Sequence, residues 1–127
     1  MFSRDADISG GPGAAAAARR IVETELDGRL PQRLVDDVAL LVTELVANGV
    51  RHGGGDPDSS VHLLLVGDGP GLHVEVSNPD GVRGVPTRRP ADLAGGGGIG
   101  LNLVEALAAR WGVRSIPRTA VWFELDC

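Results

Sequence analysis

Three polar side chains with the chemistry to hold a ligand are spaced four residues apart: Glu44, Asn48 and His52. On an α-helix each lies one turn on and about 40° round from the last, so together they form a polar track roughly 12 Å long. Taken alone, such a track is usually a solvated flank with local hydrogen bonds. Whether these side chains bind a ligand therefore depends on the residues around them.

An apolar stripe runs beside this track and predicts a long helix from Leu34 to about Gly53. The stripe recurs at the i, i+3, i+4, i+7 spacing of a core-facing helix and comprises Leu34, Val38, Leu41, Val42 and Leu45. The polar track rotates toward the stripe, so Asn48 and His52 should be half-buried. An unpaired amide or imidazole there costs about 1 to 3 kcal/mol, so each needs a partner, and a ligand is one candidate.

Two glycine features favour the ligand interpretation. Gly49 costs about 1 kcal/mol relative to alanine within a helix, which indicates close packing there. The tract Gly95–Gly98 with Gly100 opens an apolar-faced helix that should continue to Trp111, and glycines at a helix start let backbone N–H groups wrap an anion. The alternative for the tract is a flexible linker. It also matches the dinucleotide-binding pattern G-x-G-x-x-G, but no strand precedes it, so we reject that function.

The rest of the chain predicts one domain over residues 14–127 after a loose N-terminus, residues 1–13, with at most a short edge strand near Phe2. A first helix should run from Ala14 to about Leu30. Strands are expected at 61–66, 72–77, 113–116 and 119–125, the first two as a hairpin. Asn78 then either presents an amide at the end of the apolar row Leu72, Val74, Val76 or merely begins a turn.

Composition excludes several functions. The chain has twelve arginines, no lysine and a net charge of −5, so mechanisms that need a Walker lysine or a Schiff base are excluded. The negative charge and 3% aromatic content argue against nucleic acid as a partner. Cys127 is the only cysteine, which suits a reducing cytoplasm. No signal peptide or membrane-spanning segment is expected, and so no membrane association.

The run from Glu44 to His52, the following hairpin and the segment Gly98-Ile99-Gly100-Leu101 resemble the ATPase superfamily of gyrase, mismatch-repair proteins, chaperones and histidine kinases. The resemblance covers residues 14–126. It implies the Bergerat fold: an α+β two-layer sandwich with helices on one face of a mixed, mainly antiparallel sheet. The short chain, Arg19-Arg20 and the final strand Val121–Leu125 look most like the small anti-sigma-factor serine kinases.

Carried over by position, the resemblance implies that Glu44 is the catalytic base or orienter and that Asn48 ligates Mg²⁺ bound to ATP. It implies as partners a sigma factor or an antagonist protein phosphorylated on serine, and it allows a homodimer. The positions implied to contact the nucleotide are Asn48, His52, Asn78, Gly81, Gly96, Gly98, Ile99, Gly100, Leu101 and Thr119.

Two positions depart from the family pattern. Asn78 stands where the family has an aspartate that reads adenine, and its carbonyl accepts without charge assistance. Thr119 lies one residue before Ala120, where a threonine is expected, and therefore on the opposite strand face. The rival prediction is consequently a non-catalytic interaction module of the same fold with weakened or lost nucleotide binding.

Overall fold

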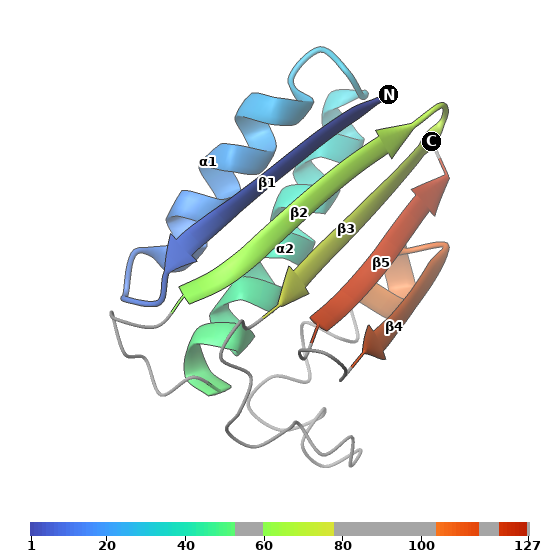
Figure 1. Cartoon of the computed structure of the whole chain (residues 1–127). Helices are drawn as coiled ribbons and strands as arrows, with labels where there is room; N and C mark the ends of the chain where they lie inside the picture. The colour runs from blue at the N-terminus through green and yellow to red at the C-terminus, as the bar shows by residue number, and fades with distance from the viewer. Residues whose placement is uncertain (53–59, 78–103, 115–119, 127) are drawn as a thin grey trace.

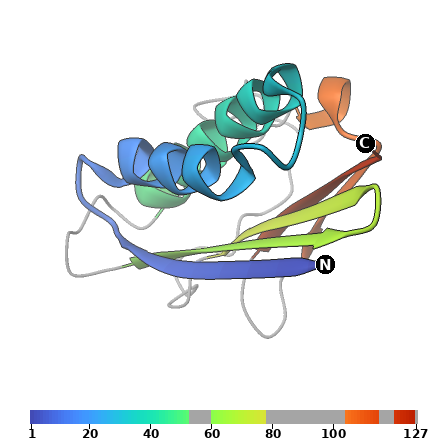
Figure 2. The ribbon, with the colours of Figure 1, turned by 90° about the horizontal axis from the view of Figure 1, so that it is seen from above.

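The structure is a computed structural model that describes residues 1–52, 60–77, 104–114 and 120–126, without the side chains of residues 51 and 52. Its described residues form a five-stranded sheet with two long helices packed on one face (Figures 1 and 2). The elements in chain order are β1 (Phe2–Ser9), α1 (Ala14–Leu26), α2 (Gln32–His52), β2 (Ser60–Asp68), β3 (Gly71–Ser77), β4 (Arg110–Arg114) and β5 (Ala120–Asp126).

The strand order is β1-β2-β3-β5-β4, and every described pairing is antiparallel. The predicted α+β fold with helices on one face is confirmed, and no parallel pair occurs among the described strands where a mixed sheet was expected. Side chains alternate across the sheet as strand geometry requires. The buried face carries Val61, Leu63, Leu65, Leu72, Val74, Val76, Phe123 and Leu125.

Both helices bury a stripe at helical spacing against this face. In α1 the buried residues are Ala14, Ala18, Val22 and Leu26. In α2 the predicted stripe is confirmed at Val38, Leu41, Val42 and Leu45, each at most 3% exposed, while Leu34 is half-buried. The apolar periodicity therefore predicted which face of α2 points into the core.

Three boundaries differ from prediction. Residues 2–9 form an edge strand paired along its length with β2, where a loose segment with a short strand was expected. Helix α1 ends at Leu26 rather than about Leu30, because Gly28 turns the chain with a φ of 77°. The helix predicted to reach Trp111 ends at 107, and Trp111 instead lies on β4 opposite Phe123, partly buried against the core.

Candidate functional site

Helix α2 places Glu44 and Asn48 at the border between its buried and exposed faces. Leu41 and Leu45 are buried at 0% and 3% exposure, and Asn48 lies about 20° from Leu41 around the helix axis because it is seven residues later. Both Glu44 and Asn48 are half-buried. The predicted half-burial of Asn48 is thus confirmed, and Glu44, one turn earlier, is half-buried as well.

The two side chains differ in how they are satisfied. Glu44 makes no hydrogen bond or ion pair with the described part of the chain, so its carboxylate is available to a ligand. Asn48 already makes an interaction within the chain. Its proposed role therefore rests on position and on the chemistry of an amide oxygen, not on an unsatisfied group.

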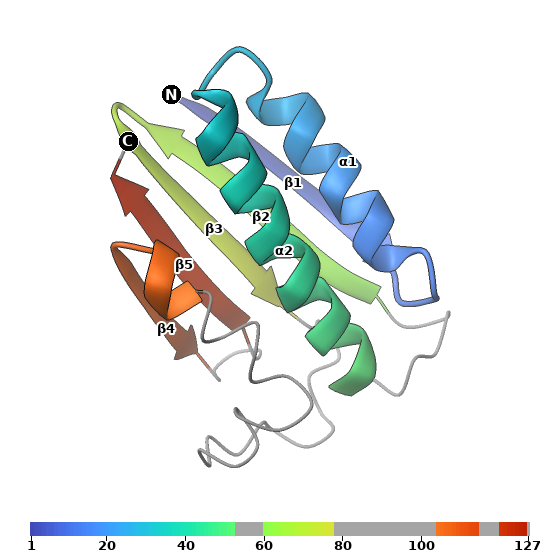
Figure 3. The same ribbon diagram turned by 180° about the vertical axis from the view of Figure 1, so that it is seen from behind.

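The last turns of α2 lie beside the end of β3, as Figures 1 and 3 show from opposite sides. One row of the sheet register crosses this end, with Ser77 opposite Ala120 and Ala120 opposite Arg114. Ser77 is 6% exposed and is the one buried polar side chain recorded among the described residues. Ser77 and Ala120 alternate with the core-facing residues of β3 and β5, so their side chains lie on the sheet face away from α2 and do not join Glu44 and Asn48.

Most other predicted nucleotide contacts fall on positions outside the described residues. Among these are Asn78 and Thr119, which directly adjoin Ser77 and Ala120 in the chain. Their predicted roles, and that of the His52 side chain, stay predictions, as do those of Gly81, Gly96, Gly98, Ile99, Gly100 and Leu101.

Ala120 itself is described and is fully buried, with 0% exposure. This is the position where the resemblance leads one to expect a threonine beside adenine. A methyl group there donates no hydrogen bond. The Ala120 side chain therefore cannot hydrogen-bond a base, and its alternation with Val121 and Phe123 places it on the sheet face away from α2.

A polar cluster that was not predicted from the sequence lies on the sheet face opposite the helices. His73 Nδ1 lies 2.8 Å from a Glu124 carboxylate oxygen and His73 Nε2 lies 2.8 Å from one of Glu75, while the imidazole stacks on Trp122 with centroids 5.8 Å apart. Arg114 donates to Glu75 at 2.7 Å, and Arg110 donates to Glu124 at 2.8 Å. The alternation of polar residues along each strand was visible, but only the register shows that they meet.

These contacts shift the pKa values of the cluster. Burial alone would lower the pKa of His73, but hydrogen bonds to Glu75 and Glu124 and their negative charges outweigh it and raise that pKa above 6.5. The hydrogen bond from Arg114 lowers the pKa of Glu75, and the hydrogen bonds from Arg110 and His73 lower that of Glu124. The cluster is therefore held together by charge-assisted hydrogen bonds near neutral pH.

A metal bound at the end of α2 would have to rely on few protein ligands. The described part of the chain contains no group of three or more His, Cys, Asp or Glu side chains placed to hold an ion. Mg²⁺ tolerates such a site, because it prefers one or two protein oxygens completed by water and phosphate oxygens. One amide oxygen from Asn48 fits that coordination chemistry.

Comparison with known proteins identifies the fold family. The sequence has no match among the curated proteins. No described helix is long and apolar enough to cross a membrane. A family model, described as histidine kinase-like ATPase domain, matches residues 8–124, which include Glu44, Asn48 and all the predicted glycines. The chain therefore belongs to the histidine kinase-like ATPase domain family.

Proposed function

We propose that this protein is a cytoplasmic ATP- and Mg²⁺-dependent regulator that phosphorylates a serine of an antagonist protein and through it controls a sigma factor. ATP binding is the activity that the family supports. The kinase reaction and both protein partners rest on the resemblance of this short chain to anti-sigma-factor serine kinases.

The observation that carries the proposal is the half-buried Glu44 carboxylate, which has no partner among the described residues and lies one helical turn before Asn48. The described residues contain no buried side-chain oxygen without a hydrogen bond, so water reaches this half-buried carboxylate. Its position beside Asn48, with no described residue engaging it, is what supports a functional role. Within this arrangement Asn48 would hold the metal, and Glu44 would orient the serine hydroxyl. Glu44 would accept the hydroxyl proton on a carboxylate oxygen while the serine oxygen bonds to the γ-phosphorus of ATP and ADP leaves. Mg²⁺, when bound, neutralises phosphate charge during transfer.

The competing function is a binding module of the same fold that has lost transfer. Ala120 favours it, since its side chain offers no hydrogen bond to a base where the resemblance leads one to expect a threonine. The two functions predict different effects of the same substitutions, so one set of variants separates them.

Nucleotide binding is tested by calorimetric titration with ATP, with Mg²⁺ or with EDTA. Asn48→Ala should weaken binding at least about tenfold, or about 1.4 kcal/mol, when Mg²⁺ is present, and much less in EDTA. An equal loss under both conditions would contradict the metal-ligand role. Wild-type protein that binds no ATP in either buffer would leave only the module.

Transfer is tested with γ-labelled ATP and candidate antagonist proteins. Glu44→Gln should leave ATP affinity close to that of wild type and slow transfer about 10²- to 10⁴-fold, the usual effect of removing a positioned base. Asp37→Asn is the matched control, because Asp37 is a half-buried acid on the same side of α2, about 10.5 Å earlier. Transfer that persists undiminished in Glu44→Gln would remove Glu44 from the mechanism.

A further inference from the structure

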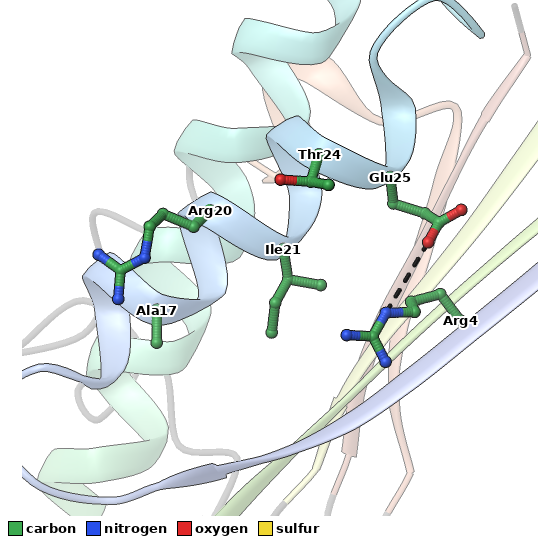
Figure 4. Close-up of a pocket in the computed structure, with 6 residues that line it drawn as sticks. All are labelled: Arg4, Ala17, Arg20, Ile21, Thr24 and Glu25. Carbon is green, nitrogen blue, oxygen red and sulfur yellow. Dashed lines mark ion pairs between the residues drawn. The ribbon is translucent and has the colours of Figure 1, made fainter.

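A groove separates the edge strand β1 from helix α1, on a part of the molecule that the proposed ATP site does not use (Figure 4). Its volume is about 320 Å³, at the lower end of the range for ligand sites. It is lined by Arg4, Ala17, Arg20, Ile21, Thr24 and Glu25.

Helix α1 contributes a second face to this groove. Residues 17, 20, 21 and 24 follow the i, i+3, i+4, i+7 spacing of one helical face, and they lie beside the face that packs on the sheet. Ala17 and Ile21 are partly buried hydrophobic residues packed against the core. The groove therefore has an apolar floor with polar groups at its rim.

The charge of the groove is positive. Arg4 Nε lies 3.8 Å from Glu25, at the distance limit of an ion pair, and Glu25 also faces Arg29 at 3.5 Å. Arg20 is exposed and makes no ion pair with any described residue. Arg4 also donates from Nη1 to the Asp5 carbonyl oxygen at 2.9 Å. Arg20 is therefore the guanidinium of the groove that has capacity for an acidic side chain of a partner.

Strand β1 supplies the second half of the site. Among the described strands it pairs only with β2, so its other edge presents backbone N–H and C=O groups that can accept another strand. On the sheet face away from the helices, β1 carries the exposed carboxylates of Asp5 and Asp7. Asp7 Oδ1 lies 2.7 Å from His62 Nδ1, whereas the Asp5 carboxylate has no partner among the described residues. A strand added to this edge would meet positive charge on the helix side and negative charge on the other.

A second copy of the chain does not fit this edge. If two β1 strands paired antiparallel about a two-fold axis, the central registers would place Asp5 opposite Asp5 or opposite Asp7. Like charges directly opposite each other destabilise a strand pair. A homodimer, which the family resemblance allows, would therefore use another surface.

We propose that β1 and α1 bind an extended segment of a partner protein by strand addition, with acidic side chains entering the groove and basic side chains facing Asp5 and Asp7. Backbone hydrogen bonds supply the binding, and the alternating charges select the partner. The inference rests on the proposed function only in requiring a protein partner, and it does not depend on ATP.

The test uses a capped, fluorescently labelled peptide that alternates glutamate and lysine over the eight residues of β1, titrated in the absence of nucleotide. Arg20→Glu should weaken its binding at least about tenfold, and Arg4→Ala, from the other wall, should also weaken it. The matched control is Arg19→Glu, which makes the same charge change on the neighbouring helix position, where Arg19 pairs with Glu23 at 3.1 Å outside the groove. This control should change the affinity less than about threefold.

Two further peptides separate strand addition from simple charge attraction. A peptide of the same composition with its glutamates in one block and its lysines in another should bind far more weakly. N-methylation of one alternating set of peptide amides should abolish binding, and N-methylation of the other set should be tolerated. Only every second residue of an added strand directs its N–H toward β1. Equal weakening by Arg20→Glu and Arg19→Glu, equal binding of the block peptide, or no binding by the alternating peptide would each overturn the proposal. A failure to bind ATP would leave these peptide results unchanged.

Discussion

Replacing Leu41 and its neighbour Leu40 by alanine tests the orientation of α2, on which the placement of Glu44 and Asn48 depends. Leu41 is 0% exposed and Leu40 is 43% exposed, although both belong to the same helix turn. Each substitution removes the same three carbon atoms and leaves the same residue. The difference between the two variants therefore reports which side of the helix faces the core.

The expected magnitudes follow from burial. Removing three fully buried carbons costs about 2.4 kcal/mol in transfer free energy at about 0.8 kcal/mol per carbon. The cavity left behind adds about 1 kcal/mol or more, so Leu41→Ala should cost about 3 to 4 kcal/mol. Leu40→Ala loses roughly half of the transfer free energy, leaves no closed cavity and gains slightly in helix propensity, for a net cost of about 1 kcal/mol.

Urea unfolding at 25 °C measures both values, and thermal unfolding should show a melting temperature lower by roughly 10 °C for Leu41→Ala. ATP affinity at 10 °C, where both variants remain folded, should match that of wild type, because neither side chain is proposed to touch nucleotide. Equal destabilisation by the two substitutions would mean that α2 is rotated about its axis relative to the structure described above. Asn48, about 20° from Leu41 around the axis, would then be misplaced as well.

Two further predictions concern the sheet. The wild-type protein should lose stability as pH rises above about 6.5, and His73→Gln should not. The raised pKa of His73 stabilises the wild-type fold below the unfolded value of 6.5, and this contribution disappears as pH rises through the folded pKa. The lowered pKa values of Glu75 and Glu124 cause a loss of stability only as pH falls below about 4.5. Urea titrations from pH 5 to 9 check this, and parallel curves for the two proteins would contradict it. Gly67→Ala should cost about 1 to 3 kcal/mol, because its Cβ would overlap the Phe2 ring, which also packs under Arg29 at 4.2 Å. The control is Gly71→Ala, whose Cβ would meet the Asp68 carbonyl oxygen at an ordinary contact distance of 3.4 Å. Equal urea midpoints for the two variants would refute the overlap.

Much of the fold was predictable because its determinants are local. The apolar stripe of α2 and the alternation Leu72, Val74, Val76 each indicate both the type of element and its buried face, and the structure agrees at these positions. The helix end at Leu26 was missed because Gly28 adopts a positive φ that the high helix propensity of the preceding residues conceals. A short edge strand near Phe2 was allowed, but the full length of β1 was not predicted, because its exposed Arg4, Asp5 and Asp7 lack the apolar alternation of a half-buried strand.

The candidate site was predictable only where its residues share a helix. Glu44 and Asn48 lie one turn apart whatever the tertiary fold, so their proximity follows from sequence spacing alone. Ser77, Ala120 and Arg114 meet in one row only because β3 pairs with β5 and β5 with β4, and nothing local specifies these pairings. The same holds for His73 and Glu124, which are 51 residues apart in sequence.

Strand order also explains why one chain can present two independent binding surfaces. Because β1 occupies a sheet edge and β2 lies between it and β3, the outer edge of β1 is apart from the last turns of α2, which lie beside the end of β3. A segment added to β1 would extend the sheet without crossing β3 or β5. Peptide binding at β1 and phosphate transfer can therefore be lost separately. Arg20→Glu should weaken peptide binding at least about tenfold and leave ATP affinity unchanged. Glu44→Gln should slow transfer about 10²- to 10⁴-fold and leave peptide binding unchanged.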